Sequence, residues 1–184
     1  YFPGFPRRAT NVKTGPRISL GRRRAAAWTC ALPWVLGVRR VQAAPTVIGQ
    51  SVPWPTIRLL DGRTVVAEQL RGRALVVTFF ATDCGYCQRH NQRLDRLART
   101  SGALPLTVLG AALDRDVVPV EAYLARQGYT FPVTMDAAPL RAVLTARRSY
   151  PLTCVIDRQG VLREVIPGEM AEDDVMGLAK WATT

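Results

Sequence analysis

Two cysteines, Cys84 and Cys87, are the side chains of this sequence best suited to covalent chemistry. They flank Gly85 and Tyr86 and follow the apolar run at residues 75–80, which predicts a buried strand. Apolar residues at helical spacing come next, so we expect both cysteines in the first turn of a helix. Unpaired N–H groups at a helix N-terminus stabilise negative charge, so we expect a lowered pKa and partial thiolate character at Cys84. Cys87, on the same turn, is then close enough to form a disulfide with it.

A Cys-x-x-Cys pair has three common interpretations: half of a zinc site, a structural disulfide, or a redox-active pair. A zinc site needs further ligands at suitable spacing, and after residue 43 the sequence offers only His90 and Cys154. A disulfide that closes so short a loop removes little unfolded-state entropy, which argues against a structural role. A strand, the cysteine pair and then an amphipathic helix favour the redox interpretation. Cys154 lies in an apolar stretch with no basic neighbours, so we expect it to be a core residue.

The formal net charge of +11 comes almost entirely from the N-terminal segment. Residues 1–43 contain nine of the 25 Lys and Arg residues and none of the 14 acidic ones. Residues 44–184 therefore contain 16 basic and 14 acidic residues, which is close to neutrality. The excess charge belongs to the N-terminal segment and does not indicate a nucleic-acid-binding domain.

The N-terminal segment, residues 1–43, has the order of features found in a signal peptide. Residues 22–24 are arginines, residues 25–38 form an apolar run that includes Cys30, and small residues at 43–44 suit a cleavage site. The run is shorter than the roughly 20 residues of a membrane-spanning helix. We therefore expect export to the periplasm, with a retained membrane anchor as the alternative. The tandem arginines leave both the general secretory and the twin-arginine routes open.

Residues 44–184 are enough for one domain with its own core. Strands alternate with helices and a terminal hairpin and helix follow, which predicts an α/β fold with a mixed sheet. Asp61-Gly62 between two extended stretches predicts a β-hairpin with a type I′ turn. The other predicted strands are apolar stretches at residues 75–80, 106–112, 131–134, 152–156 and 161–166. After the cysteine helix, Asp114 and Asp116 lead into a predicted helix with Pro119 near its first turn that runs to about residue 127, and further helices are predicted at residues 138–145 and about 171–182.

Three segments, at residues 80–87, 150–160 and 167–170, carry a family resemblance. They read Phe-Ala-Thr-Asp-Cys-Gly-Tyr-Cys, Tyr-Pro-Leu-Thr-Cys-Val-Ile-Asp-Arg-Gln-Gly and Pro-Gly-Glu-Met. In order and spacing they resemble exported bacterial thiol-disulfide oxidoreductases of the TlpA/ResA type, over roughly residues 45–184. The resemblance implies a thioredoxin-like fold, with a mixed central sheet and helices on both faces, and an active-site disulfide. We expect no cofactor.

The resemblance also implies a cis-proline loop that faces the disulfide. Pro151 matches that proline, and Tyr150 precedes it. A cis bond before proline is only slightly less stable than the trans form, and the backbone beside it could pair with a substrate strand. A trans proline at the start of a strand is the alternative. We expect Pro151 to act with the cysteines, and Tyr150, Gly85 and Tyr86 to contact the substrate.

The chain departs from the resembled proteins at four places. Asp83 stands in place of Trp before the first cysteine, Gly85-Tyr86 in place of the frequent x-Pro, His90 in place of Glu, and Thr78 in place of a buried Asp. His90 lies one helical turn beyond the second cysteine, so we expect it to accept the proton of that thiol, with a surface histidine as the alternative. The Gly-Tyr dipeptide resembles that of periplasmic disulfide isomerases of the DsbC kind, which leaves the direction of electron flow open.

These features predict an exported thiol-disulfide oxidoreductase that reduces protein disulfides through Cys84 and Cys87. Its partners would be protein thiols and disulfides, together with the membrane electron donor that the resemblance implies, and no nucleic acid. Two alternatives stay open: a disulfide oxidase or isomerase with the same site, and a copper or zinc carrier with both cysteines and His90 as ligands. A peroxidase is disfavoured because no Pro-x-x-x-Thr/Ser-x-x-Cys run precedes the cysteines.

Overall fold

The computed structural model describes residues 44–184. The predicted signal peptide, its cleavage site and Cys30 lie outside the described residues, and the predicted boundary at residue 43 stays a prediction. Within residues 44–184, no helix combines the length and the apolar composition needed to cross a membrane.

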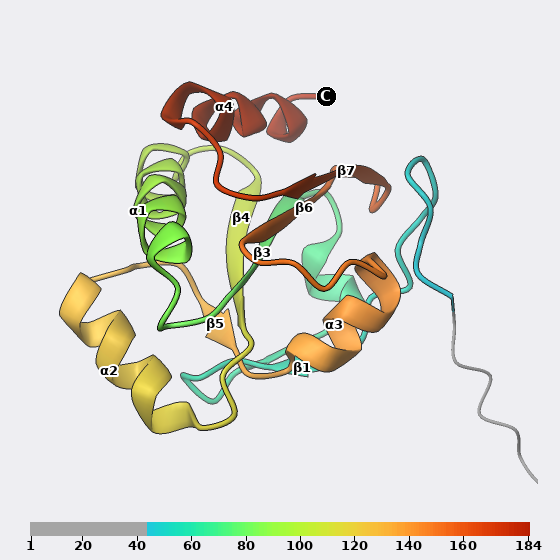
Figure 1. Ribbon diagram of the computed structural model, residues 1–184. Coiled ribbons are helices and arrows are strands. Elements are labelled where there is room, and N and C mark those ends of the chain that lie inside the picture. Colours follow the sequence, from blue (N-terminus) through green and yellow to red (C-terminus); the bar gives the residue numbers. More distant parts are fainter. Residues whose placement is uncertain (1–43) are drawn as a thin grey trace, which may run out of the picture. The chain divides into compact units, whose positions relative to one another are not determined.

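A five-stranded mixed sheet forms the centre of this domain, with the strand order β5-β4-β3-β6-β7 (Figure 1). The strands are β3 (Ala74–Phe80), β4 (Leu106–Ala112), β5 (Val133–Thr134), β6 (Leu152–Ile156) and β7 (Leu162–Pro167). Strands β3, β4 and β5 are parallel, whereas β6 and β7 are antiparallel to their neighbours. All seven residues of β3 are buried, as expected for a central strand covered on both faces. The predicted mixed sheet is confirmed.

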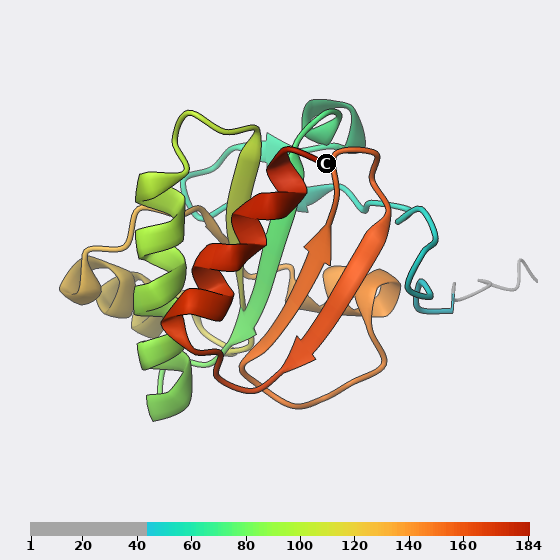
Figure 2. The same ribbon diagram turned by 90° about the horizontal axis from the view of Figure 1, so that it is seen from above.

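Helices cover both faces of the sheet, as predicted (Figure 2). On one face lie α1 (Gly85–Thr100), α2 (Val117–Gln127), α4 (Glu172–Gly177) and the 3-10 helix η2 (Leu178–Ala182); on the other lies α3 (Ala137–Leu144). The two faces follow from side-chain alternation in β3, where Val76 and Phe80 point towards α1, and Val77 and Phe79 point towards α3.

The short strands β1 (Ile57–Arg58) and β2 (Thr64–Val65) form the predicted hairpin, but its turn is not of type I′. A type I′ turn needs positive φ at both central residues. Only Gly62 has one, at 86°, and every non-glycine residue described has negative φ. Leu59 accepts a hydrogen bond from the Gly62 N–H at 3.0 Å and donates its own N–H to Arg63 at 2.8 Å. This pattern is a turn ending in a left-handed glycine bulge. A 3-10 helix, η1 (Ala67–Leu70), follows it.

One edge of the sheet, which we call the active-site edge, collects three chain segments. The parallel strands β3 and β4 both end there, and the antiparallel strand β6 begins there. The cysteine pair follows β3, and Pro151 precedes β6, so the topology brings them to one place. Cys154 lies farther along β6, opposite Val77, and is fully buried. The prediction that Cys154 is a core residue is confirmed, and burial raises the pKa of its thiol to about 12.

Candidate active site

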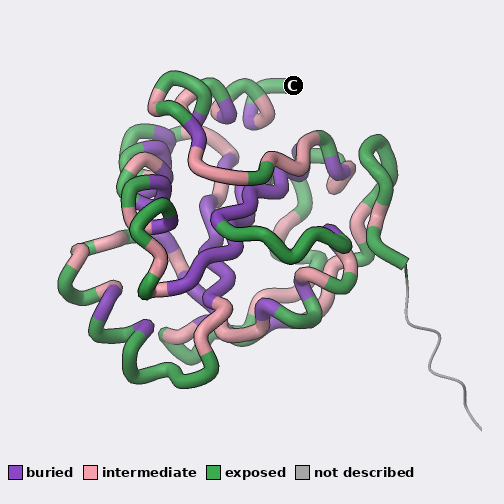
Figure 3. Tube along the Cα trace, viewed as in Figure 1, coloured by how far each residue is buried: buried purple, intermediate pink, exposed green. Residues whose placement is uncertain are grey.

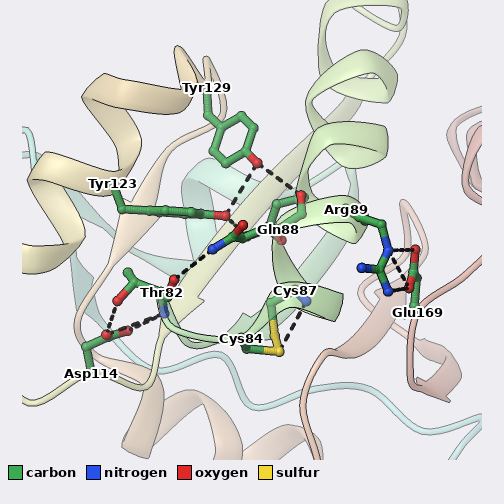
Figure 4. Close-up of a disulfide and its surroundings, with 10 residues drawn as sticks. Thr82, Cys84, Cys87, Gln88, Arg89, Asp114, Tyr123, Tyr129 and Glu169 are labelled. Carbon is green, nitrogen blue, oxygen red and sulfur yellow. Dashed lines mark hydrogen bonds and ion pairs between the residues drawn. A yellow bond between two sulfur atoms is a disulfide. The ribbon is translucent and has the colours of Figure 1, made fainter.

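Cys84 and Cys87 form a disulfide at the N-terminus of α1 (Figure 4). Their Cα atoms are 5.2 Å apart. Cys84 is the N-cap residue of the helix, and its Sγ accepts a hydrogen bond from the Cys87 N–H at 3.2 Å. Cys84 is partly exposed, whereas Cys87 is fully buried. The sulfur that another protein can reach is therefore also the sulfur that the helix N-terminus would stabilise as a thiolate.

The turn that leads into the cysteines is held by a carboxylate from the neighbouring strand connection. Asp114, just after β4, accepts hydrogen bonds from the Thr82 hydroxyl at 2.5 Å and from the Thr82 N–H at 3.2 Å. Gln88 donates from its side-chain amide to the Thr82 carbonyl at 3.3 Å. Figure 4 shows these contacts beside the disulfide. The sequence alone predicts only that Asp114 leads into a helix. Its position, just after the end of a parallel strand, is the feature that could have indicated a role at the active site.

A chain of tyrosines connects α1 to α2 and to the segment before β5. The Tyr129 hydroxyl donates to the Gln88 carbonyl at 3.1 Å, and Tyr123 donates to Tyr129 at 3.4 Å. Asn91 on α1 donates to Tyr123 at 3.3 Å. Burial raises the pKa of Tyr129 well above its ordinary value, so this phenol stays a neutral donor. These contacts fix the first turns of α1 behind the disulfide.

The Tyr150–Pro151 bond is cis, which confirms the predicted conformation. Tyr150 and Pro151 line a surface hollow of about 620 Å³ together with Tyr86, which directly precedes Cys87. Tyr86 is 64 % exposed and Tyr150 is 49 % exposed. The structure therefore brings together the predicted substrate-contacting tyrosines and the predicted proline, although their roles stay predictions.

His90 is fully buried, so the alternative of a surface histidine is wrong. Its Nε2 lies 2.8 Å from the Thr153 hydroxyl, and its Nδ1 accepts the Met170 N–H at 3.4 Å. Because Nδ1 accepts, the proton of the neutral ring is on Nε2, which donates to Thr153. Burial, helped by the charge of Arg93 and opposed by Glu169, lowers the pKa of His90 to about 4. The ring is therefore neutral at physiological pH.

The loop between β7 and α4 is held against α1 by an ion-pair cluster. Glu169 accepts from Arg89 at 2.8 Å and from Arg93 at 2.6 Å, and Arg93 also donates to the Met170 carbonyl at 2.6 Å. The arginines hold the pKa of Glu169 below its usual range. Arg89, His90 and Arg93, all on α1, thus hold in place the loop at Glu169 and Met170. This loop forms part of the wall of the hollow beside Tyr86.

Thr78, which replaces the buried aspartate of thioredoxins, is fully buried and lies beside Thr153 in the register of β3 and β6. Its hydroxyl has no hydrogen-bond partner among the described residues. No group of three His, Cys, Asp or Glu side chains in residues 44–184 is arranged to hold a metal ion.

Comparisons with known proteins agree with this geometry. The sequence pattern of the AhpC/TSA family matches residues 48–165. The thiol-disulfide oxidoreductase ResA of Geobacillus thermodenitrificans is 27 % identical over 130 residues, which are 70 % of this chain and 74 % of that protein.

Two solved structures share the fold. A thiol:disulfide interchange protein of the thioredoxin family from Chlorobium tepidum matches with a TM-score of 0.67 and 26 % identity, over 76 % of this chain and 99 % of that one. A secreted disulfide oxidoreductase of Mycobacterium tuberculosis matches with a TM-score of 0.59 and 18 % identity, over 68 % and 94 %. The chain therefore belongs to the AhpC/TSA family, as a thiol-disulfide oxidoreductase with a thioredoxin-like fold.

Proposed function

We propose that this protein reduces disulfides in other proteins outside the cytoplasm, with Cys84 as the nucleophile and Cys87 as the resolving thiol. One observation carries the assignment of the two roles: Cys84 is partly exposed and caps helix α1, whereas Cys87 is fully buried. An external disulfide can meet only the first sulfur, and the buried second sulfur can attack only the bond that forms on the first.

The reaction begins with the protein in its dithiol form. The Cys84 thiolate attacks one sulfur of the substrate disulfide, which forms a mixed disulfide and releases the other substrate sulfur as a thiolate. Cys87 then loses its proton and attacks the Cys84 sulfur, which forms the Cys84–Cys87 disulfide and releases the second substrate thiolate. The two substrate thiolates take up two protons, which balance those lost by Cys84 and Cys87. Two electrons pass to the substrate, and the protein is left with the Cys84–Cys87 disulfide.

Pro151 and the tyrosines are proposed to position the substrate. The backbone at Tyr150–Pro151 borders the same hollow as Tyr86, so an extended substrate segment could pair with it while its cysteine lies near Cys84. Gly85 carries no side chain that would block this approach, and space for an added Cβ is open there. Replacing Pro151 should therefore weaken the mixed disulfide more than it changes the cysteine pair itself.

The predicted role of His90 as a proton acceptor stays a prediction. Its contacts support a second role more directly, because both ring nitrogens already take part in hydrogen bonds to Thr153 and Met170. Taking up a proton at Nδ1 would mean giving up the bond from Met170. We propose that His90 holds α1, β6 and the loop before α4 in place around the disulfide. A His90→Gln variant that exchanges thiols normally from pH 5 to 8, beside a slow His90→Ala variant, would support positioning over proton transfer.

The direction of electron flow is tested by the reduction potential of the Cys84–Cys87 couple, equilibrated against thiol buffers. We expect a value near the roughly −270 mV of thioredoxin, which suits a reductase with an electron supply. A value between about −180 and −120 mV would instead favour the disulfide isomerase or oxidase alternative, which the Gly85-Tyr86 dipeptide keeps open.

Export and a membrane electron donor belong to the same proposal. The signal-peptide pattern of residues 1–43 supports export, and the matched M. tuberculosis protein is described as secreted. A reductase in an oxidising compartment needs electrons from outside that compartment. Expression of the full chain in a bacterium, followed by fractionation and N-terminal sequencing, tests the location and the predicted cleavage after residue 43.

A further inference from the structure

Several exposed apolar side chains lie on the segments that meet at the active-site edge, and we call them the apolar rim: Tyr86, Val117, Val118 and Tyr150. Within residues 44–184, six large apolar side chains are exposed, and four of them lie at the active-site edge. Tyr86 is in the first turn of α1, Val117 and Val118 begin α2 after strand β4, and Tyr150 precedes β6. Val118 is 70 % exposed. Of these four side chains, Tyr86 and Tyr150 line one hollow together and offer apolar surface to another chain there.

The surface beside this apolar rim is hollowed. The hollow has a volume of about 620 Å³, within the range of ligand pockets, and Tyr86, Tyr150, Pro151 and Met170 form part of its wall. It can take several side chains of an extended segment whose cysteine reaches Cys84. The polar part of its wall is the Arg93–Glu169 ion pair, in which the carboxylate is already neutralised by two arginines.

The loop that leads to Pro151 carries positive charge without a counter-charge. Residues 146–150 are all exposed, and Figure 3 shows this segment in green between α3 and the sheet. Arg147 and Arg148 lie in it, and Arg141 lies just before it on α3. None of the three has a carboxylate within ion-pair distance among the described residues.

The arginines also crowd one another. The charge of Arg148 adds to burial in lowering the pKa of Arg141, and Arg141 donates to the Arg148 carbonyl at 3.5 Å. Like charges held close together are unfavourable until an anion compensates them. A carboxylate supplied from outside the domain would do so.

The other side of the disulfide has the opposite charge. Asp83 precedes the nucleophilic cysteine, and Asp114 and Asp116 lie in the β4–α2 connection, with Arg115 as the only cation among them. Residues 44–184 are nearly neutral as a whole, so the charges on the two sides of the disulfide are not part of a general excess of one sign. Electrostatic attraction would therefore orient a substrate segment with its acidic residues towards Arg147 and Arg148, in the exposed loop at residues 146–150.

We propose that the active-site edge selects extended protein segments that carry acidic residues near their target cysteine, with the carboxylates placed at Arg147 and Arg148. The inference rests on the proposed function and deepens it by naming the substrate class. The apolar rim supplies contact area for any extended chain, whereas the arginines distinguish acidic from basic chains, mainly through the rate of association.

The test uses the reduced full chain and three peptides with one cysteine each, blocked as a 2-pyridyl disulfide, a neutral chromogenic group. The peptides differ only at two positions beside the cysteine, which are Glu, Gln or Lys. Two exposed ion pairs should make the Glu peptide react about three- to tenfold faster than the Gln peptide at low salt, and the Lys peptide slower. The preference should fade at about 1 M salt, where the screening length falls to about 3 Å.

The double variant Arg147→Gln/Arg148→Gln should bring the Glu-to-Gln rate ratio to about one. The matched control Arg71→Gln/Arg158→Gln removes two exposed arginines at the opposite edge of the sheet and should keep the wild-type ratio. Equal wild-type rates with all three peptides, or an unchanged ratio in the Arg147/Arg148 variant, would overturn the inference while leaving the reductase proposal intact. A wild-type protein that reacts with none of the peptides would instead overturn the proposed function.

Discussion

The buried imidazole of His90 makes the stability of the domain depend on pH in a way that can be calculated. Its pKa is about 4 in the folded protein, against 6.5 for an ordinary histidine. Because the folded value is the lower one, the unfolded chain takes up the proton first. The stabilisation is complete above pH 6.5 and is lost as the pH falls towards 4. Between pH 7 and pH 5 the loss should be about 2 kcal/mol.

The variant His90→Gln removes the titrating ring but can still donate to Thr153 and accept from Met170. We expect urea unfolding at pH 7 and pH 5 to show that wild type loses about 2 kcal/mol more than the variant between these conditions. Carboxylates with lowered pKa values, such as Asp95 and Glu169, titrate in both proteins and cancel in the difference. The control variant Arg71→Gln should follow wild type.

The same pair of measurements can contradict this account. Equal losses in wild type and His90→Gln would show that His90 has an ordinary pKa and that the ring is hydrated in solution. A larger loss in the variant would show that the ring is protonated in the folded state, as a proton-transfer role near neutral pH would require. Either result would remove the basis for treating His90 as a neutral positioning residue.

The other predictions concern the cysteines, the turn before them and the core. Cys87→Ser should accumulate a mixed disulfide with substrate and Cys84→Ser should form none, as non-reducing mass spectrometry would show; the reverse pattern would exchange the two roles. Asp114→Asn weakens the charge-assisted bonds to Thr82, so we expect a loss of about 1–2 kcal/mol in unfolding free energy and slower thiol exchange, whereas exposed Asp116→Asn should change neither. Gly110→Ala should cost about 1–3 kcal/mol, because the new methyl group would lie 3.0 Å from Phe80, Phe131 and Val133; thermal unfolding matching that of wild type would show that these side chains move aside.

Periodicity and local motifs were sufficient to predict the order of the main elements and the place of the cysteines. The continuous apolar sequence of β3 predicts a buried strand, and the helical spacing of apolar residues in α1 predicts a helix with one buried face. Both patterns involve only residues that are close together in the sequence. The predicted type I′ turn is wrong because Asp61 keeps a negative φ and only Gly62 takes the positive φ that both central residues would need. Dipeptide identity predicts that a turn occurs more reliably than it predicts the backbone angles within it.

The contacts that position the site could not be read from the sequence. His90 bonds to residues 63 and 80 positions away, and Thr82 bonds to a carboxylate 32 positions away. Helical spacing places His90 on the same side of α1 as the cysteines, but its burial depends on how β6 and the loop before α4 close over it. Such partners become visible only when the register of the sheet is known, because one residue of shift would turn Thr153 to the other face.

The third thiol of the domain has a use that follows from its position in the sheet. Cys154 lies in β6, between β3 and β7, and its side chain is fully buried on the face of the sheet that α3 covers, so a reagent can reach it only when that part of the core opens. Its rate of alkylation, followed by peptide mapping, would therefore report how often the core between α3 and the sheet opens, as amide exchange does for backbone groups. Because that thiol belongs to the native sequence, the same protein sample could report both the redox state of the Cys84–Cys87 pair and the opening of its own core without an engineered cysteine.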